Sequence, residues 1–251
     1  VIATKVSAAH LAPADLAAAC ERSLTNLQTD YVDLYQIHWP NHEIPLAETV
    51  GTLTRLKEQG KIRAIGVSNF GVRDLSDLLA LTACATNQIP YSLLWRVIER
   101  EIKPLCQANG VGIICYSPLA QGLLTGRYRS ADDVPDGLAR TRHYAGTRPL
   151  ATHGGAGCEA EVFAALEAVR KITAEIGASM AAVALAWVRQ QPGVTSYLTG
   201  ARKPEEVALN LPSLELTLSD DAIAALSAAT EKVKDKLGTN PDPWMATSRY
   251  R

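Results

Sequence analysis

Two segments that follow one another along the chain decide the fold class: Tyr31-Val-Asp-Leu-Tyr-Gln-Ile-His38 and Ile62-Arg-Ala-Ile-Gly-Val-Ser68. Both are short, rich in β-branched residues and apolar on both faces, which is typical of buried strands in a parallel sheet. The residues between them carry apolar side chains at helical spacing from Leu46 to Leu56, and Gly60 ends that pattern. The order strand, helix, strand predicts a βαβ unit.

The same alternation continues along the chain. The remaining predicted strands are residues 1–6, 87–91, 111–116 and 194–199, and helical patterns lie between them. Six such units are compatible with a doubly wound sheet or with part of a (β/α)8 TIM barrel. A doubly wound dinucleotide-binding sheet usually carries a Gly-x-Gly-x-x-Gly turn after a strand. The nearest match, Gly110-Val-Gly112, leads into a strand and has Cys115 at the third glycine position.

Polar residues at the carboxyl ends of the predicted strands favour the barrel, because active sites of such barrels lie at that rim. The strand ends carry Thr4-Lys5, Gln36-Ile37-His38, Ser68-Asn69, Tyr116-Ser117 and Thr199-Gly200-Ala201-Arg202. We therefore expect a single domain over residues 1–251, a (β/α)8 barrel to which the chain contributes about six βα units. A mobile loop at about 127–157 and a C-terminal coil at 238–251 complete the prediction.

Several of these residues can be interpreted in more than one way. Lys5 can be a solvated lysine at a strand end, a Schiff-base nucleophile or a cation that lowers a neighbouring pKa. His38 can be a core histidine or a functional one. Arg202 lies just before a helix that begins near Pro204, where it can be an exposed cation or part of an anion site. A metal pair of His38 and His42 is discounted because Pro40 breaks any helix between them.

Composition excludes other classes of protein. The chain has 25 Lys and Arg against 26 Asp and Glu, so it lacks the basic excess of a nucleic-acid-binding protein. No run of apolar residues reaches the length of about eighteen that a membrane span needs. The five cysteines are scattered and never form a Cys-x-x-Cys pair, which argues against a zinc ribbon or a disulfide framework. We expect a cytoplasmic protein with no nucleic-acid or membrane partner.

The motifs together resemble those of the aldo-keto reductase family, in its bacterial branch. The resemblance is carried, in the family's order, by Val1-Ile-Ala-Thr-Lys5-Val6, residues 31–40, Ile65-Gly-Val-Ser-Asn-Phe70, Asn87-Gln88, residues 116–126 and Thr199-Gly-Ala-Arg202. It implies an oxidoreductase that reduces aldehydes or ketones to alcohols, reversibly, by hydride transfer from NADP(H) to a small carbonyl substrate.

The resemblance also implies roles for individual residues. Lys5 would lower the pKa of a catalytic tyrosine and His38 would orient the substrate carbonyl, while Trp39 and Trp95 are expected in the substrate pocket. The residues assigned to the cofactor are Ser68, Asn69 and Gln88 around the nicotinamide amide, Tyr116 stacked on the ring, Ser117, Leu119, Gln121 and Leu124 along the pyrophosphate, and Gly200, Arg202, Glu206 and Asn210 near the 2′-phosphate and adenine.

The sequence departs from the family in one respect. The family's catalytic tyrosine and its aspartate partner belong to a segment before Lys5, and the 251 residues contain no such segment. We therefore expect an N-terminally incomplete sequence that lacks the first two strands, roughly 60 residues at about 30 per βα unit. Two other functions stay open: a cofactor-binding regulatory or sensor protein without catalysis, and a Schiff-base lyase that uses Lys5.

Overall fold

The computed structural model describes all 251 residues and contains a six-stranded sheet with the strands in sequence order. Its strands are β1 (Ala3–Val6), β2 (Val32–Ile37), β3 (Ile62–Ser68), β4 (Thr86–Pro90), β5 (Gly112–Tyr116) and β6 (Val194–Tyr197). β1, β2, β3 and β4 pair in parallel. All six predicted strands are present, with ends shifted by at most two residues. This strand order is the one expected for part of a (β/α)8 barrel.

The chain forms two compact units. The N-terminal unit comprises Val1–Ile89, Pro104–Ile113 and Tyr250–Arg251, and the C-terminal unit comprises Pro90–Lys103 and Ile114–Arg249.

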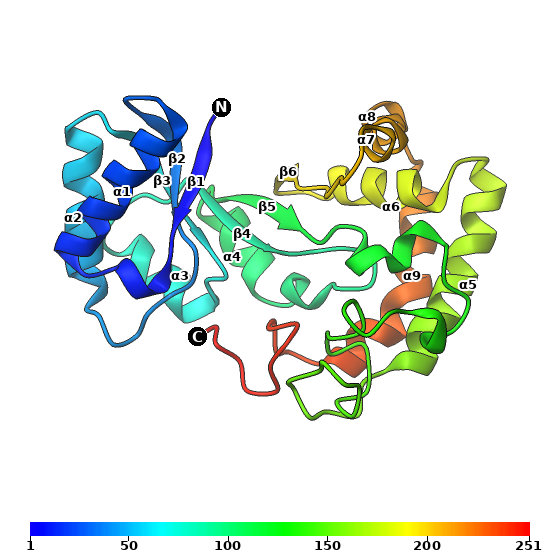
Figure 1. The fold of residues 1–251 in the computed structure, drawn as a ribbon. Coiled ribbons are helices and arrows are strands. Elements are labelled where there is room, and N and C mark those ends of the chain that lie inside the picture. The colour runs from blue at the N-terminus through cyan, green and yellow to red at the C-terminus, as the bar shows by residue number, and fades with distance from the viewer. The chain divides into compact units, whose positions relative to one another are not determined.

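In the N-terminal unit, helices connect parallel strands. They are α1 (Pro13–Leu27), α2 (Leu46–Glu58), α3 (Val72–Leu79) and α4 (Ile102–Ala108), with a short 3-10 turn, η1, at Ala8–His10. α1 and α2 lie beside one another on one side of strands β1 to β3 (Figure 1). α1 begins with Pro13 at its first turn and ends where Gln28 adopts a left-handed conformation. The sequence spacing places Leu16, Cys20, Leu24 and Leu27 on one face of this helix; the first three are buried, whereas Leu27 is 44% exposed.

The C-terminal unit is mostly helical. Its helices are α5 (Glu159–Ile176), α6 (Met180–Arg189), α7 (Pro204–Asn210), α8 (Pro212–Glu215) and α9 (Asp220–Leu237), with 3-10 turns η2 (Val97–Glu99), η3 (Ala120–Thr125) and η4 (Ala131–Asp133). α5 and α9 lie side by side (Figure 1). α6 is buried on every side from Ala182 to Val188, which explains why its sequence is apolar without a polar face. The chain after Leu237 forms no helix or strand.

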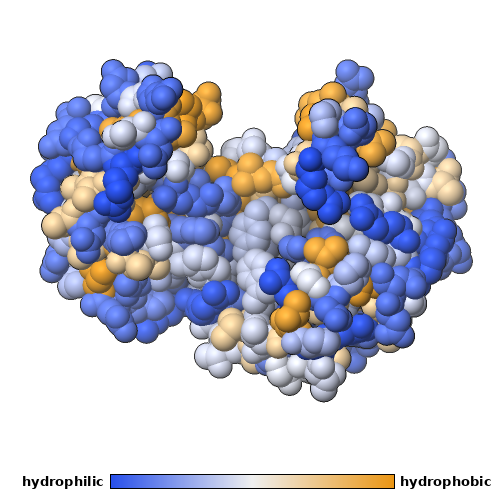
Figure 2. Space-filling model, in the orientation of Figure 1, coloured by the Kyte–Doolittle hydropathy of each residue, from blue (hydrophilic) through white to orange (hydrophobic).

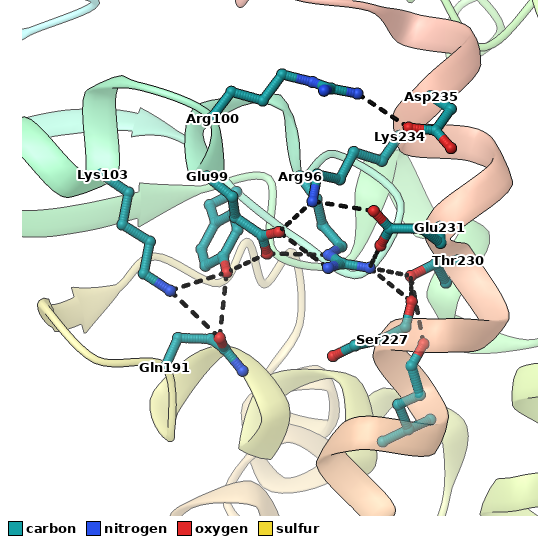
Figure 3. A network of polar contacts seen from close by, with 12 residues as sticks. Arg96, Glu99, Arg100, Lys103, Gln191, Ser227, Thr230, Glu231, Lys234 and Asp235 are labelled. Carbon is teal, nitrogen blue, oxygen red and sulfur yellow. Dashed lines mark hydrogen bonds and ion pairs between the residues drawn. The ribbon is translucent and has the colours of Figure 1, made fainter.

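A network of charged side chains joins α9 to the segment around η2 (Figure 3). The Arg96 guanidinium donates two parallel hydrogen bonds of 2.9 Å to the Glu99 carboxylate and lies 3.0 Å from Glu231. The Lys234 ammonium lies 3.1 Å from both glutamates. The Tyr91 hydroxyl also donates to Glu99, at 2.7 Å. In this charge network, formed by Arg96, Glu99, Glu231 and Lys234, two cations face two anions.

The connection at 127–157 contains only the short turn η4, but it has buried side chains of its own. His143 is 4% exposed, and its Nε2 lies 2.9 Å from the Leu94 carbonyl oxygen. Burial lowers the pKa of His143 to about 4, so this imidazole is neutral near pH 7. Gly157 passes so close to Tyr144 that an added Cβ would lie 2.3 Å from the Tyr144 carbonyl oxygen. A side chain at position 157 would overlap the Tyr144 backbone, so glycine is required there.

No single helix is both long and apolar enough to cross a membrane, and only α5 and α6 counted together across a 92° bend satisfy that criterion.

Apolar surface is visible over α7 and α8 (Figure 2), where Val207, Leu209, Leu211 and Leu214 are about half exposed or more.

Candidate active site

The strand register of the N-terminal unit places several predicted site residues on one face of the sheet. Lys5 pairs with Gln36, Gln36 pairs with Gly66, and Ser68 pairs with Gln88. Side chains two residues apart on a strand point to the same face, so His38 shares the face of Gln36 and Ser68 shares that of Gly66. Lys5, His38, Ser68 and Gln88 therefore share one face at the carboxyl ends of β1 to β4.

The face is closely packed beneath the rim. Gln36 is 1% exposed and donates a hydrogen bond of 3.2 Å to the Val67 carbonyl oxygen. A Cβ on Gly66 would lie 2.7 Å from Thr86 Oγ1 and 2.9 Å from Leu34 Cδ1. Gly66 thus leaves the space that these neighbouring side chains fill.

Lys5 acts electrostatically on His38. Partial burial lowers the pKa of the Lys5 ammonium, which forms no hydrogen bond or ion pair in the structure. Partial burial and, as the smaller cause, the charge of Lys5 lower the pKa of the His38 imidazole. The His38 backbone is fixed by a 2.9 Å hydrogen bond from its N–H to the Val6 carbonyl oxygen. A cation with a reduced proton affinity thus lies near an imidazole that is neutral at pH 7.

Ser68, Asn69 and Gln88 are buried and connected. The Ser68 hydroxyl donates to the Gln88 carbonyl oxygen at 2.9 Å. The Asn69 side-chain amide donates to the His38 carbonyl oxygen at 3.0 Å and to Ser68 Oγ at 3.1 Å. Asn69 has a φ of 61°, a left-handed conformation that is uncommon outside glycine and is enriched at functional sites. The structure thus joins three of the predicted cofactor-binding residues to His38.

In the C-terminal unit, seven predicted cofactor-binding residues line one cavity of about 680 Å³. They are Ser117, Leu119, Gln121, Gly200, Arg202, Glu206 and Asn210. Ser117 and Gln121 have positive φ values of 52° and 56°, and the Gln121 amide donates to Ser117 Oγ at 3.2 Å. Leu124, predicted for the same group, is fully buried and does not line this cavity.

Arg202 is not a lone cation. Its guanidinium lies 3.1 Å from one Glu206 carboxylate oxygen, and its backbone N–H donates to the other at 2.8 Å. Hydrogen bonds from Arg202 lower the pKa of Glu206. Arg127 lines the same cavity and provides a second positive charge. The helix that follows, α7, is only seven residues long.

Tyr116 and Trp95 line a second, small cavity of the C-terminal unit together with His143 and Trp244. The Tyr116 and Trp244 rings are nearly parallel, with centroids 6.1 Å apart and an interplanar angle of 10°. Trp95 is 3% exposed and meets the His143 ring edge-on at 5.2 Å. Trp39, the other predicted pocket residue, belongs to the N-terminal unit and meets the Tyr250 ring edge-on at 5.3 Å.

Sequence reasoning missed two aromatic residues of the C-terminal coil, Trp244 and Tyr250. Trp244 packs on Tyr116, and the Tyr250 hydroxyl donates to Asn69 Oδ1 at 2.7 Å. The coil has no helical or strand periodicity, so the pattern assigns its side chains to no face. The only signal was two bulky aromatic residues in a segment that otherwise looks solvated.

Comparisons with known proteins agree with these features. A sequence model described as the Aldo/keto reductase family matches residues 1–231. The chain is 36% identical over 214 residues to the NADH-specific methylglyoxal reductase of Escherichia coli (strain K12), covering 84% of this chain and 63% of that protein. It is 34% identical over 199 residues to aldo-keto reductase YhdN of Bacillus subtilis (strain 168), covering 79% and 58%.

Solved structures show the same fold. A crystal structure of an aldo/keto reductase from Klebsiella pneumoniae in complex with NADP and acetate is 34% identical and has a TM-score of 0.69, covering 96% of this chain and 71% of the other. The glycerol dehydrogenase AKR11B4 of Gluconobacter oxydans is 30% identical with a TM-score of 0.76, covering 92% and 67%. The six parallel strands accordingly correspond to part of a (β/α)8 barrel.

The chain belongs to the aldo/keto reductase family. It spans 58% to 63% of the length of the two curated relatives named above.

Proposed function

We propose that the protein reduces aldehydes or ketones to alcohols, reversibly, with NADP(H) as hydride donor. The observation that carries the proposal is the placement of Lys5 and His38 at the ends of adjacent strands, on one face, with the Lys5 charge lowering the pKa of His38. The E. coli relative, an NADH-specific methylglyoxal reductase, supports the same reaction class. The complex of the K. pneumoniae reductase with NADP supports NADP(H) as the cofactor.

The residues of the large cavity fit a phosphate-bearing cofactor. Its walls carry the Ser117 hydroxyl, the Gln121 amide and the guanidinium groups of Arg127 and Arg202, which are donors or cations suited to phosphate oxygens. The backbone with positive φ at Ser117 and Gln121 is the kind of strained turn that ligand sites retain. We assign the diphosphate and adenosine portions to this cavity, and the nicotinamide amide to Ser68, Asn69 and Gln88.

The bound nicotinamide would supply the hydride to the carbonyl carbon. Negative charge then develops on the carbonyl oxygen, and a group that stabilises this charge lowers the barrier. Neutral His38 can donate a hydrogen bond to that oxygen and set its direction. The Lys5 ammonium, which has no carboxylate partner, stabilises the developing anion and favours the ionised form of any acid that delivers the proton.

Loss of NADPH absorbance on adding methylglyoxal tests the proposal. Wild-type protein should oxidise NADPH, and Lys5→Met should lower kcat by about 10²–10³-fold, the cost of losing one transition-state charge partner. Lys57→Met is the matched control, because Lys57 is an exposed lysine on α2. It should leave the rate unchanged.

Three outcomes would contradict the proposal. Equal rates for Lys5→Met and wild type would remove Lys5 from the reaction. Quenching of cofactor fluorescence without turnover of any tested carbonyl would favour a cofactor-binding sensor. A borohydride-trapped adduct of the carbonyl compound on Lys5 would favour a Schiff-base lyase.

A further inference from the structure

Backbone hydrogen bonds hold Arg251 against the start of α3. The Arg251 backbone N–H donates to Asp74 Oδ2 at 2.8 Å, and the Arg251 backbone oxygen accepts from the N–H groups of Arg73 and Asp74 at 2.8 and 3.1 Å. A Cβ on Gly71 would lie 2.2 Å from the same Arg251 oxygen. Gly71 has ordinary extended backbone angles, so its importance lies in the space that it leaves for Arg251.

This attachment holds Tyr250 against the predicted site. Tyr250 is 5% exposed, its ring meets Trp39 edge-on, and its hydroxyl donates to Asn69 Oδ1 at 2.7 Å. Two residues assigned to the substrate and the cofactor are therefore contacted by one side chain of the C-terminal coil.

The hydrogen bonds determine which way the Asn69 amide faces. Its nitrogen donates to the carbonyl oxygen of His38 and to Ser68 Oγ, and its oxygen accepts from Tyr250. In the flipped orientation the amide oxygen would face the His38 carbonyl oxygen, and two acceptors repel. The Tyr250 hydroxyl is a donor on the oxygen side and stabilises the observed orientation.

We propose that Tyr250 is a positioning residue for cofactor binding, acting through Asn69. It holds the Asn69 oxygen where the nicotinamide amide is recognised, and the Asn69 nitrogen in turn holds the backbone of His38. The inference rests on the proposed function, and it makes the attachment of Arg251 to α3 part of what positions the site.

Tyr250→Phe tests the proposal because it removes the hydroxyl and keeps the ring beside Trp39. KM for NADPH should rise about three- to tenfold, the size expected for one lost hydrogen bond, and kcat should stay within about twofold. Tyr31→Phe is the matched control, since the Tyr31 ring packs under Arg63 at the start of β2, at the opposite end of that strand from His38. Its KM should equal that of wild type.

Two further variants separate positioning from general loss of structure. In an Asn69→Ala background, adding Tyr250→Phe should change KM no further, because the residue through which Tyr250 acts is gone. Gly71→Ala should raise KM to the level of Tyr250→Phe, since its Cβ displaces the Arg251 oxygen while its own backbone angles remain allowed.

The proposal is overturned if wild-type protein turns over and Tyr250→Phe has an unchanged KM, or if the effects of Asn69→Ala and Tyr250→Phe simply add. A fall in kcat at constant KM would also contradict it. Wild-type protein that neither binds NADPH nor turns over would instead refute the proposed function, and the positioning role with it.

Discussion

Two polar clusters of the molecule differ in how their charges are matched. In the charge network of the C-terminal unit, Arg96 and Lys234 face Glu99 and Glu231 at about 3 Å (Figure 3). At the strand ends of the N-terminal unit, the Lys5 ammonium has no carboxylate partner. In both clusters the side chains are at least partly buried. Only in the charge network, however, are the positive charges balanced by nearby carboxylates.

The difference separates structural from functional polar groups. A buried charge with its partners in place mainly makes the fold specific, and its removal leaves a partner uncompensated. A partly buried cation without a partner costs stability, and such groups concentrate where charge develops during a reaction. The matched network therefore fastens α9 to the η2 segment, whereas the unmatched Lys5 lies where we propose the reaction centre.

The largest expected effect is on folding stability in the matched network. Glu99→Gln should lower the free energy of unfolding by about 3–5 kcal/mol, because Arg96 and Lys234 lose their shared carboxylate. Lys5→Met should leave the free energy of unfolding unchanged or raise it, because it removes an unpaired cation. Urea denaturation of both variants measures the contrast. Equal losses in the two variants would abolish the distinction between the clusters.

The pH dependence of stability sharpens this contrast. Burial alone would raise the pKa of Glu99, but hydrogen bonds and charges from Arg96 and its neighbours bring it below its ordinary value of 4.5. A lowered folded pKa stabilises the fold above the unfolded pKa, and this contribution is lost as the pH falls through the folded pKa. Wild-type protein should lose stability below about pH 4.5, and the Glu99→Gln variant should lack that part of the loss.

A smaller effect is expected from the packing beneath the rim. Gly66→Ala should destabilise the fold by about 1–3 kcal/mol, because its Cβ would overlap Thr86 and Leu34 on the face that carries the candidate site. Gly51→Ala is the control, because in the middle of α2 its nearest neighbour would be an Arg55 nitrogen at 3.8 Å. This change should stabilise the helix by about 0.5–1 kcal/mol. Thermal unfolding that ranks the two variants in the opposite order would contradict the close packing.

The smallest effect is expected at the exposed ion pair of the large cavity. Glu206→Gln frees Arg202 to meet a phosphate, so the preference for NADPH over NADH should increase, by less than about fivefold because exposed ion pairs contribute little. Thermal stability should not change. Kinetics with both cofactors provide the measurement, and a shift toward NADH would show that Glu206 does not compete for Arg202.

The sequence predicted those parts of the molecule that repeat a pattern. The alternation of strand and helix patterns predicted the strands to within two residues. The polar strand ends predicted that Lys5, His38 and Ser68 lie at one rim, whereas Gln88 came only from the family resemblance. The ends of helices were less certain: helical spacing predicts helices over residues 72–82 and 220–234, whereas α3 ends at Leu79 and α9 continues to Leu237.

Contacts made by irregular segments could not be predicted in this way. Tyr250 reaches Asn69 across 181 residues of sequence, and nothing in the coil before it indicates which strand end it meets. The role of Gly71 is equally invisible in the sequence, because it depends on the approach of the Arg251 backbone. Long-range contacts without periodicity appear only once the chain is folded.

The most direct test of the account is the NMR titration of the His38 imidazole in wild-type protein and in Lys5→Met, with resonances assigned from a His38→Asn spectrum. The account predicts a pKa below the ordinary 6.5 in wild type and a higher pKa in Lys5→Met, because the nearby positive charge is gone. Identical His38 titration curves in the two proteins would show that the ammonium and the imidazole do not share one site.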